Sequence, residues 1–233
     1  MTKKLEKIGN RMSLKEINLI SKLHLQTKRN YLERMKNNKI HCMKVSSKFE
    51  KNYWDGPRKY GYGGYKYIKN RWKNVAKNII KRFDLTYKSK ILDLGCGKGY
   101  LIYEIKKIIP EIKVVGLDIS KYAVKHAHPD IKKYVKFGDA RKKLRFKKKE
   151  FNLLISIGCL HNLELNELFF SLKEISRVSK KQYLLVESYK DEKELFNLQC
   201  WALTCKSFFS KKEWSWIFKK KKLSGFFELI YFS

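Results

Sequence analysis

From residue 90 onward, short apolar runs alternate along the chain with segments whose apolar positions lie three and four residues apart. The runs have the length of buried strands and the segments have the periodicity of helices. In chain order they are strand 90–94, helix 100–109, strand 113–117, helix 121–127, strand 134–137, strand 151–157, helix 164–178 and strand 182–187. Alternation at this spacing is typical of parallel strands joined by right-handed crossovers. We therefore expect an α/β fold with a doubly wound, mostly parallel sheet.

The two sides of this core continue the pattern less regularly. Residues 72–83 have helical periodicity, and so has the stretch 195–204. Ser210 and Glu213 form a capping-box pattern, Ser-Lys-Lys-Glu, in front of a further predicted helix. Residues 226–232 are apolar and aromatic and predict a final strand.

The first fifty residues are predicted to be helical. Ser13 to Glu16 match a capping box, and Leu14, Ile17, Ile20 and Leu23 follow at helical spacing. Tyr31, Leu32 and Met35 continue a second, shorter helix. We interpret residues 1–50 as a helical extension packed on the main domain, in preference to a helix lying on a membrane surface.

Residues 51–72 differ sharply from their neighbours. The stretch from Tyr53 to Tyr65 is rich in glycine and aromatic residues, which is incompatible with a regular helix. The predicted organisation is therefore an N-terminal extension (1–50), a lid-like loop (51–72) and a cofactor-binding domain (73–233).

Charge complicates this interpretation. The chain has 233 residues and a formal charge of +32, from 54 Lys and Arg against 22 Asp and Glu. A strongly basic domain suggests nucleic-acid binding, but only 9 of the 54 basic residues are Arg, which phosphate recognition favours. The excess is spread along the chain, at +9, +10, +9, −1 and +5 in successive blocks of fifty, as an AT-rich genome would produce.

Other classes of protein are excluded more directly. No apolar run approaches the roughly 18 residues of a membrane-spanning helix, and Met1 to Glu6 lead into charged sequence without the apolar core of a signal peptide. The five cysteines form no C-x-x-C pair and lie at no zinc-finger spacing to histidine. We expect a cytoplasmic protein with reduced thiols, no metal site and no membrane contact; the oligomeric state is left open.

One segment carries recognisable chemistry. The strand ending at Leu94 breaks into Gly95, Gly97 and Gly99 before the next helix, so that the backbone can turn tightly and approach a ligand. The spacing G-x-G-x-G differs from the dinucleotide and P-loop patterns. Acidic residues end or follow three successive strands, at Asp93, Asp118 and Asp139, and carboxylates suit an amino group, a ribose and an adenine better than phosphates. For Asp139, a plain helix cap is the alternative.

With these residues the sequence resembles the class I S-adenosylmethionine-dependent methyltransferases over roughly residues 70–190. The resemblance implies S-adenosyl-L-methionine as cofactor, with its amino-acid end near Asp93 and the adjacent glycine backbone, its ribose on Asp118, and its adenine between Ile119, Asp139 and Ala140. The cofactor-binding set that it implies is Asp93, Gly95, Cys96, Gly97, Gly99, Asp118, Ile119, Asp139 and Ala140.

Candidates for the reaction itself follow the fourth strand. His161 lies just beyond residues 151–157, on the side where such sheets bind ligands, and is the candidate general base; ordering the loop is its alternative role. Cys159 has no visible basic partner and is interpreted as a core residue. The lid tyrosines, among them Tyr62 and Tyr65, and the strand-end acid Glu187 are candidate substrate contacts.

The acceptor is inferred from what the chain lacks and from its charge. The Pro-Pro-aromatic motif of nucleobase amine methylation does not follow the fourth strand, nor is there a Pro-Cys pair. The one acidic interval holds Glu164, Glu167, Glu187, Asp191, Glu192 and Glu194, which we expect to flank the substrate opening. The sequence thus favours methylation of a small-molecule amine or hydroxyl. An RNA methyltransferase whose lysine-rich surface holds the phosphate backbone is the alternative.

Overall fold

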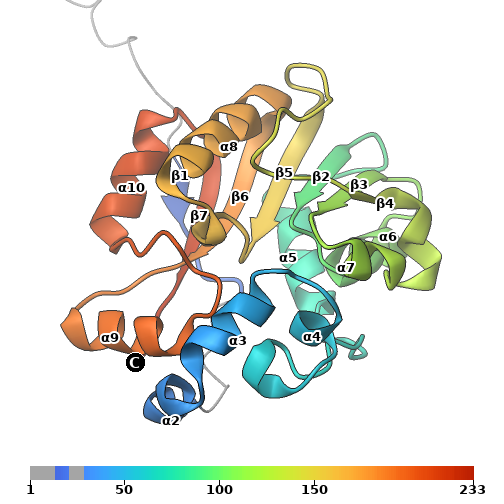
Figure 1. Cartoon of the computed structure of the whole chain (residues 1–233). Helices are drawn as coiled ribbons and strands as arrows, with labels where there is room; N and C mark the ends of the chain where they lie inside the picture. Colours follow the sequence, from blue (N-terminus) through green and yellow to red (C-terminus); the bar gives the residue numbers. More distant parts are fainter. Residues whose placement is uncertain (1–13, 21–28) are drawn as a thin grey trace, which may run out of the picture.

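The computed structural model describes residues 14–20 and 29–233 and contains a seven-stranded sheet in which every neighbouring pair is parallel. The strand order is β1-β7-β6-β5-β2-β3-β4 (Figure 1). The strands are β1 (Leu14–Glu16), β2 (Lys90–Leu94), β3 (Lys113–Asp118), β4 (Val135–Phe137), β5 (Phe151–Ile157), β6 (Ser179–Glu187) and β7 (Gly225–Ile230). The doubly wound α/β prediction is confirmed, and the sheet is parallel throughout.

Helices cover both faces of the sheet because its central strands are apolar on both sides. Ile91 and Leu153 face one core cluster, while their chain neighbours Leu92 and Leu154 face the other, as the alternation of side chains along a strand requires. The first cluster packs against α5 (Lys73–Arg82) and α6 (Tyr100–Ile108). The second packs against α8 (Leu165–Val178) and α10 (Lys211–Lys220). The capping box predicted at Ser210 and Glu213 is formed at the start of α10.

The N-terminal prediction is wrong in part. Leu14–Glu16, predicted as a helix start, forms strand β1 and pairs with Gly225–Phe227 of β7. Without β1, the backbone of β7 would be an open sheet edge, and this long-range pairing outweighs the local helical pattern. The carboxylate of Glu228 then accepts hydrogen bonds from the backbone N–H groups of Leu19 and Ile20, at 2.8–3.0 Å. Ser13 and Leu23 of the same predicted helix lie outside the described residues.

The second, shorter helix predicted from Tyr31, Leu32 and Met35 is confirmed as α2 (Tyr31–Lys36). It is followed by α3 (Lys39–Ser46) and by a single turn, α4 (Lys51–Trp54), at the start of the lid-like loop. These helices and α9 (Glu192–Trp201) lie together at the end of the sheet where the central strands finish (Figure 1). Segments far apart in the chain therefore enclose the carboxyl ends of the strands.

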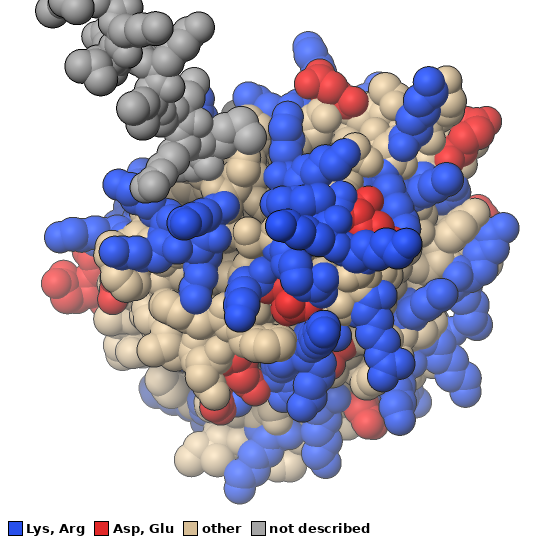
Figure 2. Space-filling model, turned by 90° about the horizontal axis from the view of Figure 1, so that it is seen from above, with Lys and Arg blue, Asp and Glu red and all other residues tan. Residues whose placement is uncertain are grey.

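The opposite end of the sheet carries many lysines. Figure 2 shows this face, on which Lys and Arg side chains greatly outnumber acidic ones. Exposed lysines that lie before or at the first positions of the strands include Lys88, Lys113, Lys132, Lys133, Lys147, Lys148, Lys149, Lys180, Lys181 and Lys222. No helix of the described residues is long and apolar enough to cross a membrane.

Candidate functional site

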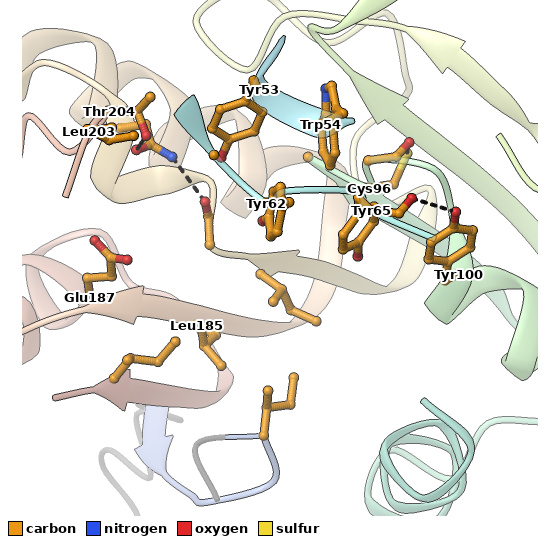
Figure 3. Close-up of a pocket in the computed structure, with 18 of the residues that line it drawn as sticks. Tyr53, Trp54, Tyr62, Tyr65, Cys96, Tyr100, Leu185, Glu187, Leu203 and Thr204 are labelled. Carbon is orange, nitrogen blue, oxygen red and sulfur yellow. Dashed lines mark hydrogen bonds between the residues drawn. The ribbon is translucent and has the colours of Figure 1, made fainter. Parts of the chain in front are cut away.

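Two adjoining cavities open at the carboxyl ends of the central strands. The larger cavity has a volume of about 420 Å³ and the smaller about 170 Å³. Tyr53, Trp54 and Tyr62 line both, as do Gly95 and Gly158, so the two form one site with two compartments. Figure 3 shows residues of the larger cavity, among them aromatic side chains of the lid-like loop.

The glycine turn after β2 forms one wall of both compartments. Gly95, Gly97 and Gly99 have positive φ angles of 83°, 56° and 75°, which glycine adopts without strain. A Cβ atom at Gly97 would lie 2.9 Å from the ring of Trp54, and one at Gly95 would lie 2.6 Å from the Cβ atom of Cys159. Glycine at these two positions therefore lets the lid and the β5 loop close on the turn. Gly99 instead caps α6.

Asp118 ties the end of β3 to this turn. Its Oδ2 atom accepts a hydrogen bond from the Gly97 N–H group at 2.7 Å, and its Oδ1 atom accepts one from Ser120 at 2.8 Å. Burial raises the pKa of Asp118, and the two N–H donors oppose that rise. Asp118 and Ile119, to which the family resemblance assigns the ribose and part of the adenine contact, line the smaller cavity.

Asp93 faces the larger cavity and is only 4% exposed. Burial, reinforced by the negative charge of Asp118, raises its pKa to about 7. Within the described part of the chain, no donor forms a hydrogen bond with its carboxylate. A buried carboxyl group in this state would be stabilised by a cation entering the cavity.

Asp139 and Ala140 line the smaller cavity, together with Arg141. Burial would raise the pKa of Asp139, but hydrogen bonds from the side chain and backbone of Arg141 outweigh this and lower it. The guanidinium of Arg141 donates Nε–H and Nη2–H to this carboxylate, both at 2.9 Å. This pairing was not foreseen from the sequence. Cys96, by contrast, lines the larger cavity.

The lid-like loop is folded over the glycine turn. Its rings pack on one another, with Trp54 stacked on Tyr62 at a centroid distance of 5.3 Å and Tyr65 stacked on Tyr100 at 5.1 Å (Figure 3). Tyr62 is 47% exposed, and its exposed surface faces the two cavities that it lines. The predicted substrate contacts Tyr62 and Tyr65 are thus brought to the larger cavity.

An ion pair holds this loop to the cofactor turn. The ammonium of Lys98, which is 4% exposed, lies 2.7 Å from the carboxylate of Asp55 and also donates to the Tyr65 carbonyl. Tyr122 donates to the same carboxylate, and the Trp54 indole N–H donates to Ser120 Oγ, both at 2.8 Å. Burial would raise the pKa of Asp55, but Lys98 and Tyr122 lower it. We call Asp55 and Lys98 the latch.

His161 and Glu187 meet in the larger cavity. His161 lies in a short 3-10 turn, Leu160–Asn162, and Glu187 ends β6. His161 Nδ1 accepts the Glu187 backbone N–H at 3.1 Å, and its Nε2 lies 3.5 Å from the carboxylate Oε2 of Glu187. Burial lowers the pKa of His161, with Glu187 opposing. Burial raises the pKa of Cys159 to about 12; this half-buried residue packs against the second core cluster and also lines the smaller cavity.

The acidic interval does not surround the opening as expected. Of its six acids, Glu187 lines the larger cavity and Glu167 the smaller. Glu164 caps α8 and pairs with Lys206, Asp191 caps α9, and the buried Glu194 accepts a hydrogen bond from the Lys190 N–H group. Capping and pairing explain the local run of acids, so it gives no acidic rim.

Arginines line the larger cavity instead, and sequence analysis missed them. Arg29, Arg34, Arg58 and Arg71 all belong to its wall. Arginine is rare in this chain, with 9 residues in 233, and four of the nine fall between positions 29 and 71. That local concentration was the signal available in the sequence.

Comparison with known proteins agrees with this geometry. The sequence profile described as the methyltransferase domain matches residues 85–222, more than half of the chain. This chain belongs to that methyltransferase family. It is a class I S-adenosylmethionine-dependent methyltransferase, since its sheet, glycine turn and strand-end acids are those of that class.

A solved structure shows the same fold. The YcgJ protein of Bacillus subtilis is 20% identical, with a TM-score of 0.50, over 63% of this chain and 66% of that one. A Haloferax volcanii protein, solved in complex with the Trm112 methyltransferase activator, is 19% identical with a TM-score of 0.49, over 63% and 65%. The match spans slightly less than two thirds of both proteins. A search of curated proteins found no match to the methyltransferase.

The residues present fit the methyl donor of the family. The uncompensated carboxyl of Asp93 faces the larger cavity and suits the ammonium of an amino-acid group. The smaller cavity offers the carboxylates of Asp118 and Asp139 and the apolar side chains of Ile119 and Ala140, a set suited to a ribose and an adenine.

Proposed function

We propose that this methyltransferase acts on an amine or hydroxyl of a small molecule, held in the larger cavity. The observation that carries the proposal is the cavity itself. Its volume of about 420 Å³ is within the range of small-molecule sites, and it adjoins the glycine turn. Aromatic rings of the lid line it and would limit the access of water to the reacting groups.

The cofactor contacts in this proposal divide between the compartments. Asp93, Gly95, Cys96 and Gly97 would hold the amino-acid end in the larger cavity. Asp118, Ile119, Asp139 and Ala140 would hold the adenosine in the smaller one, and Gly99 would support the turn from the start of α6. Bound S-adenosylmethionine supplies an electrophilic methyl group. The protein has to align the acceptor with it and to accept a proton where the acceptor carries one.

His161 and Glu187 are suited to that proton step as a pair. A backbone N–H can donate only to an unprotonated ring nitrogen, so the Nδ1 atom of neutral His161 carries no proton and Nε2 carries one. Nε2 faces the Glu187 carboxylate. We infer that His161 orients Glu187, and that Glu187 accepts the proton or hydrogen bond of the acceptor. This gives the predicted catalytic residue His161 a positioning role.

The arrangement of charge supports a small molecule over RNA. The lysine-rich face of Figure 2 lies at the amino ends of the strands, opposite the cavities at their carboxyl ends. A nucleic acid held on that face would not present a base or ribose to the glycine turn. The lysines of that face therefore cannot hold the backbone of an RNA whose base or ribose enters the larger cavity.

The test is a methyl-transfer screen with radiolabelled S-adenosylmethionine against a metabolite extract and total RNA from the same cells. We expect label in small molecules, in a reaction that is lost with Asp118→Ala and kept with Asp130→Ala, an exposed acid outside both cavities. Label confined to RNA would contradict the proposal.

A further inference from the structure

Three guanidinium groups surround a single indole ring in the wall of the larger cavity. The Cζ atoms of Arg29, Arg34 and Arg58 lie 5.5, 5.0 and 5.2 Å from the ring centroid of Trp201. They come from the segment before α2, from α2 and from the lid, while Trp201 ends α9. We call these three residues the arginine cluster.

The positions of two members are fixed by backbone carbonyl groups. Arg34 donates Nη1–H to the Arg58 carbonyl at 2.9 Å and Nε–H to the Trp201 carbonyl at 3.4 Å. Arg58 donates from Nη1 to the carbonyl of Gly61. The Nη2 groups of Arg34 and Arg58 donate to nothing in the described part of the chain. Both guanidiniums are thus held in place, and their Nη2–H groups remain available to donate to a ligand.

Arg34 and Arg58 form no ion pair with an acidic side chain of the described residues. Burial lowers the pKa of both, and repulsion lowers it further, from Arg58 on Arg34 and from Arg29 on Arg58. Cation–π contact with Trp201 offsets part of this cost but neutralises no charge. A partly desolvated group of like charges is what a bound anion would stabilise.

The cluster shares its cavity with the proposed reacting groups. Arg29, Arg34 and Arg58 line the same cavity as Glu187, His161 and the glycine turn. An anion on the cluster would therefore belong to a molecule that also reaches Glu187. Arginine favours carboxylates and phosphates, whose oxygens match the paired N–H groups of a guanidinium.

We propose that the arginine cluster is an oxyanion site that selects methyl acceptors carrying a carboxylate or a phosphate group. The substrate class in this proposal rests on the proposed function, whereas anion binding by the cluster does not. The acceptor is then a small molecule with an anionic group at one end and an amine or hydroxyl at the other. This adds an anionic group to the amine or hydroxyl acceptor favoured by the sequence.

Anion binding is tested without any methyl transfer. Thermal unfolding is followed with increasing inorganic phosphate or acetate, at ionic strength held constant with sodium chloride, for the full chain and three variants. Arg34→Gln and Arg58→Gln each remove one guanidinium of the cluster. Arg145→Gln is the matched control, because Arg145 is exposed and lies outside both cavities.

We expect a saturable rise of the unfolding midpoint in the unmodified protein and in Arg145→Gln. In the two cluster variants the apparent Kd should increase about 10- to 100-fold, the effect of losing one charge-assisted hydrogen-bonding group. A response to phosphate alone or to acetate alone identifies which group the acceptor carries. An equal rise in all four proteins, or no rise with either anion, would overturn the proposal.

A second measurement addresses the substrate class. Labelled products of the metabolite screen are separated on an anion-exchange resin, and the KM for the purified acceptor is measured with Arg58→Gln. We expect a retained product and a KM raised about 10- to 100-fold with the S-adenosylmethionine Kd unchanged. A neutral product whose KM is insensitive to Arg58→Gln would refute the acceptor class. If no small molecule is labelled, the proposed function fails while the anion titrations still decide on the cluster.

Discussion

The two compartments of the site are built in different ways. The smaller cavity takes two of its three acidic groups from the ends of neighbouring strands, Asp118 as the last residue of β3 and Asp139 just after β4, and the lid also lines it. The larger cavity draws on segments from residue 20 to residue 230, including the lid, the β5 loop, β6 and the end of α9. The strand-end compartment follows from the topology of any parallel sheet, whereas the composite compartment depends on how distant segments pack.

This difference separates what is general from what is specific. The compartment built from strand ends is the proposed site of the adenosine, and its acids Asp118, Asp139 and Glu167 lie within the matched residues 85–222. The composite compartment has contributions from the N-terminal helices and the lid, which lie outside the matched residues 85–222. Specificity for the acceptor is therefore expected to reside in residues that the family profile does not cover. Changes to each compartment should have separable effects.

The largest effect is expected at Asp118, where the smaller cavity meets the glycine turn. Asp118→Ala removes the acceptor for the N–H groups of Gly97 and Ser120 as well as the proposed ribose contact. We expect kcat/KM to fall by at least about 1,000-fold, as two buried donors and one ligand contact are lost together. Steady-state kinetics and calorimetric titration with S-adenosylmethionine measure the loss.

Asp130→Ala is the control, because this exposed acid lies in the same half of the domain. Asp118→Asn keeps the shape and one acceptor oxygen, and should retain more cofactor binding than the alanine variant. Full activity of Asp118→Ala with a folded far-ultraviolet spectrum would show that the strand-end compartment does not hold the cofactor.

A smaller loss, confined to turnover, is expected in the larger cavity. Glu187→Gln removes the carboxylate that His161 orients, so kcat should fall by about 100-fold with little change in the Kd for S-adenosylmethionine. His161→Asn should lower kcat about 10-fold through misplacement of Glu187. Stopped-time methyl-transfer assays with the identified acceptor provide the measurement.

The pH profile separates the two roles of His161. Its pKa is lowered by burial, so a positioning histidine stays neutral and kcat in the His161→Asn variant keeps the same dependence on pH as in the unmodified protein. If His161 is itself the general base, the acidic limb of the profile disappears in His161→Asn, and the assignment to Glu187 is then wrong.

The same contrast between compartments explains what the sequence could predict. The sheet, the capping box at Ser210 and the strand-end positions of Asp93, Asp118 and Asp139 follow from local periodicity and spacing. Strand β1 could not be predicted, because its stability comes from pairing with β7 more than 200 residues away. The arginine cluster and the latch are also long-range contacts. The acids of residues 164–194 misled because helix capping and substrate recognition use the same residue types.

The charge of Asp93 leads to two predictions with opposite pH dependence, one for the affinity for S-adenosylmethionine and one for the stability of the ligand-free protein. Asp93→Asn should weaken S-adenosylmethionine binding about 30-fold at pH 8, the order of one charge-assisted contact. The unmodified protein should lose affinity as the pH falls through about 7, because protonation of Asp93 removes its charge, and Asp93→Asn should lack this dependence. Calorimetric titrations between pH 6 and 8.5 test both statements.

The stability of the ligand-free protein should depend on pH in the opposite direction to its affinity for S-adenosylmethionine. The folded pKa of about 7 lies above the ordinary value of 3.8, so the folded state binds the proton more tightly and loses stability as the pH rises from about 4 to 7. Asp93→Asn should therefore be the more stable protein at pH 8 and gain little at pH 5. Urea unfolding at the two pH values measures this, and an equal difference at both would argue against a raised pKa.

The smallest effect is expected at the latch, which links the composite compartment to the turn. Breaking it with Asp55→Asn or Lys98→Met should accelerate cofactor dissociation about 5-fold, because Trp54 and Tyr65 remain stacked over the turn but lose their ionic anchor. Each single change leaves a charge without its partner. The cofactor should therefore dissociate from the double variant more slowly than the combined effects of the two single changes imply. Stopped-flow displacement of S-adenosylhomocysteine measures the rates. Strict additivity would mean that Asp55 and Lys98 act independently, and that the lid closes without the latch.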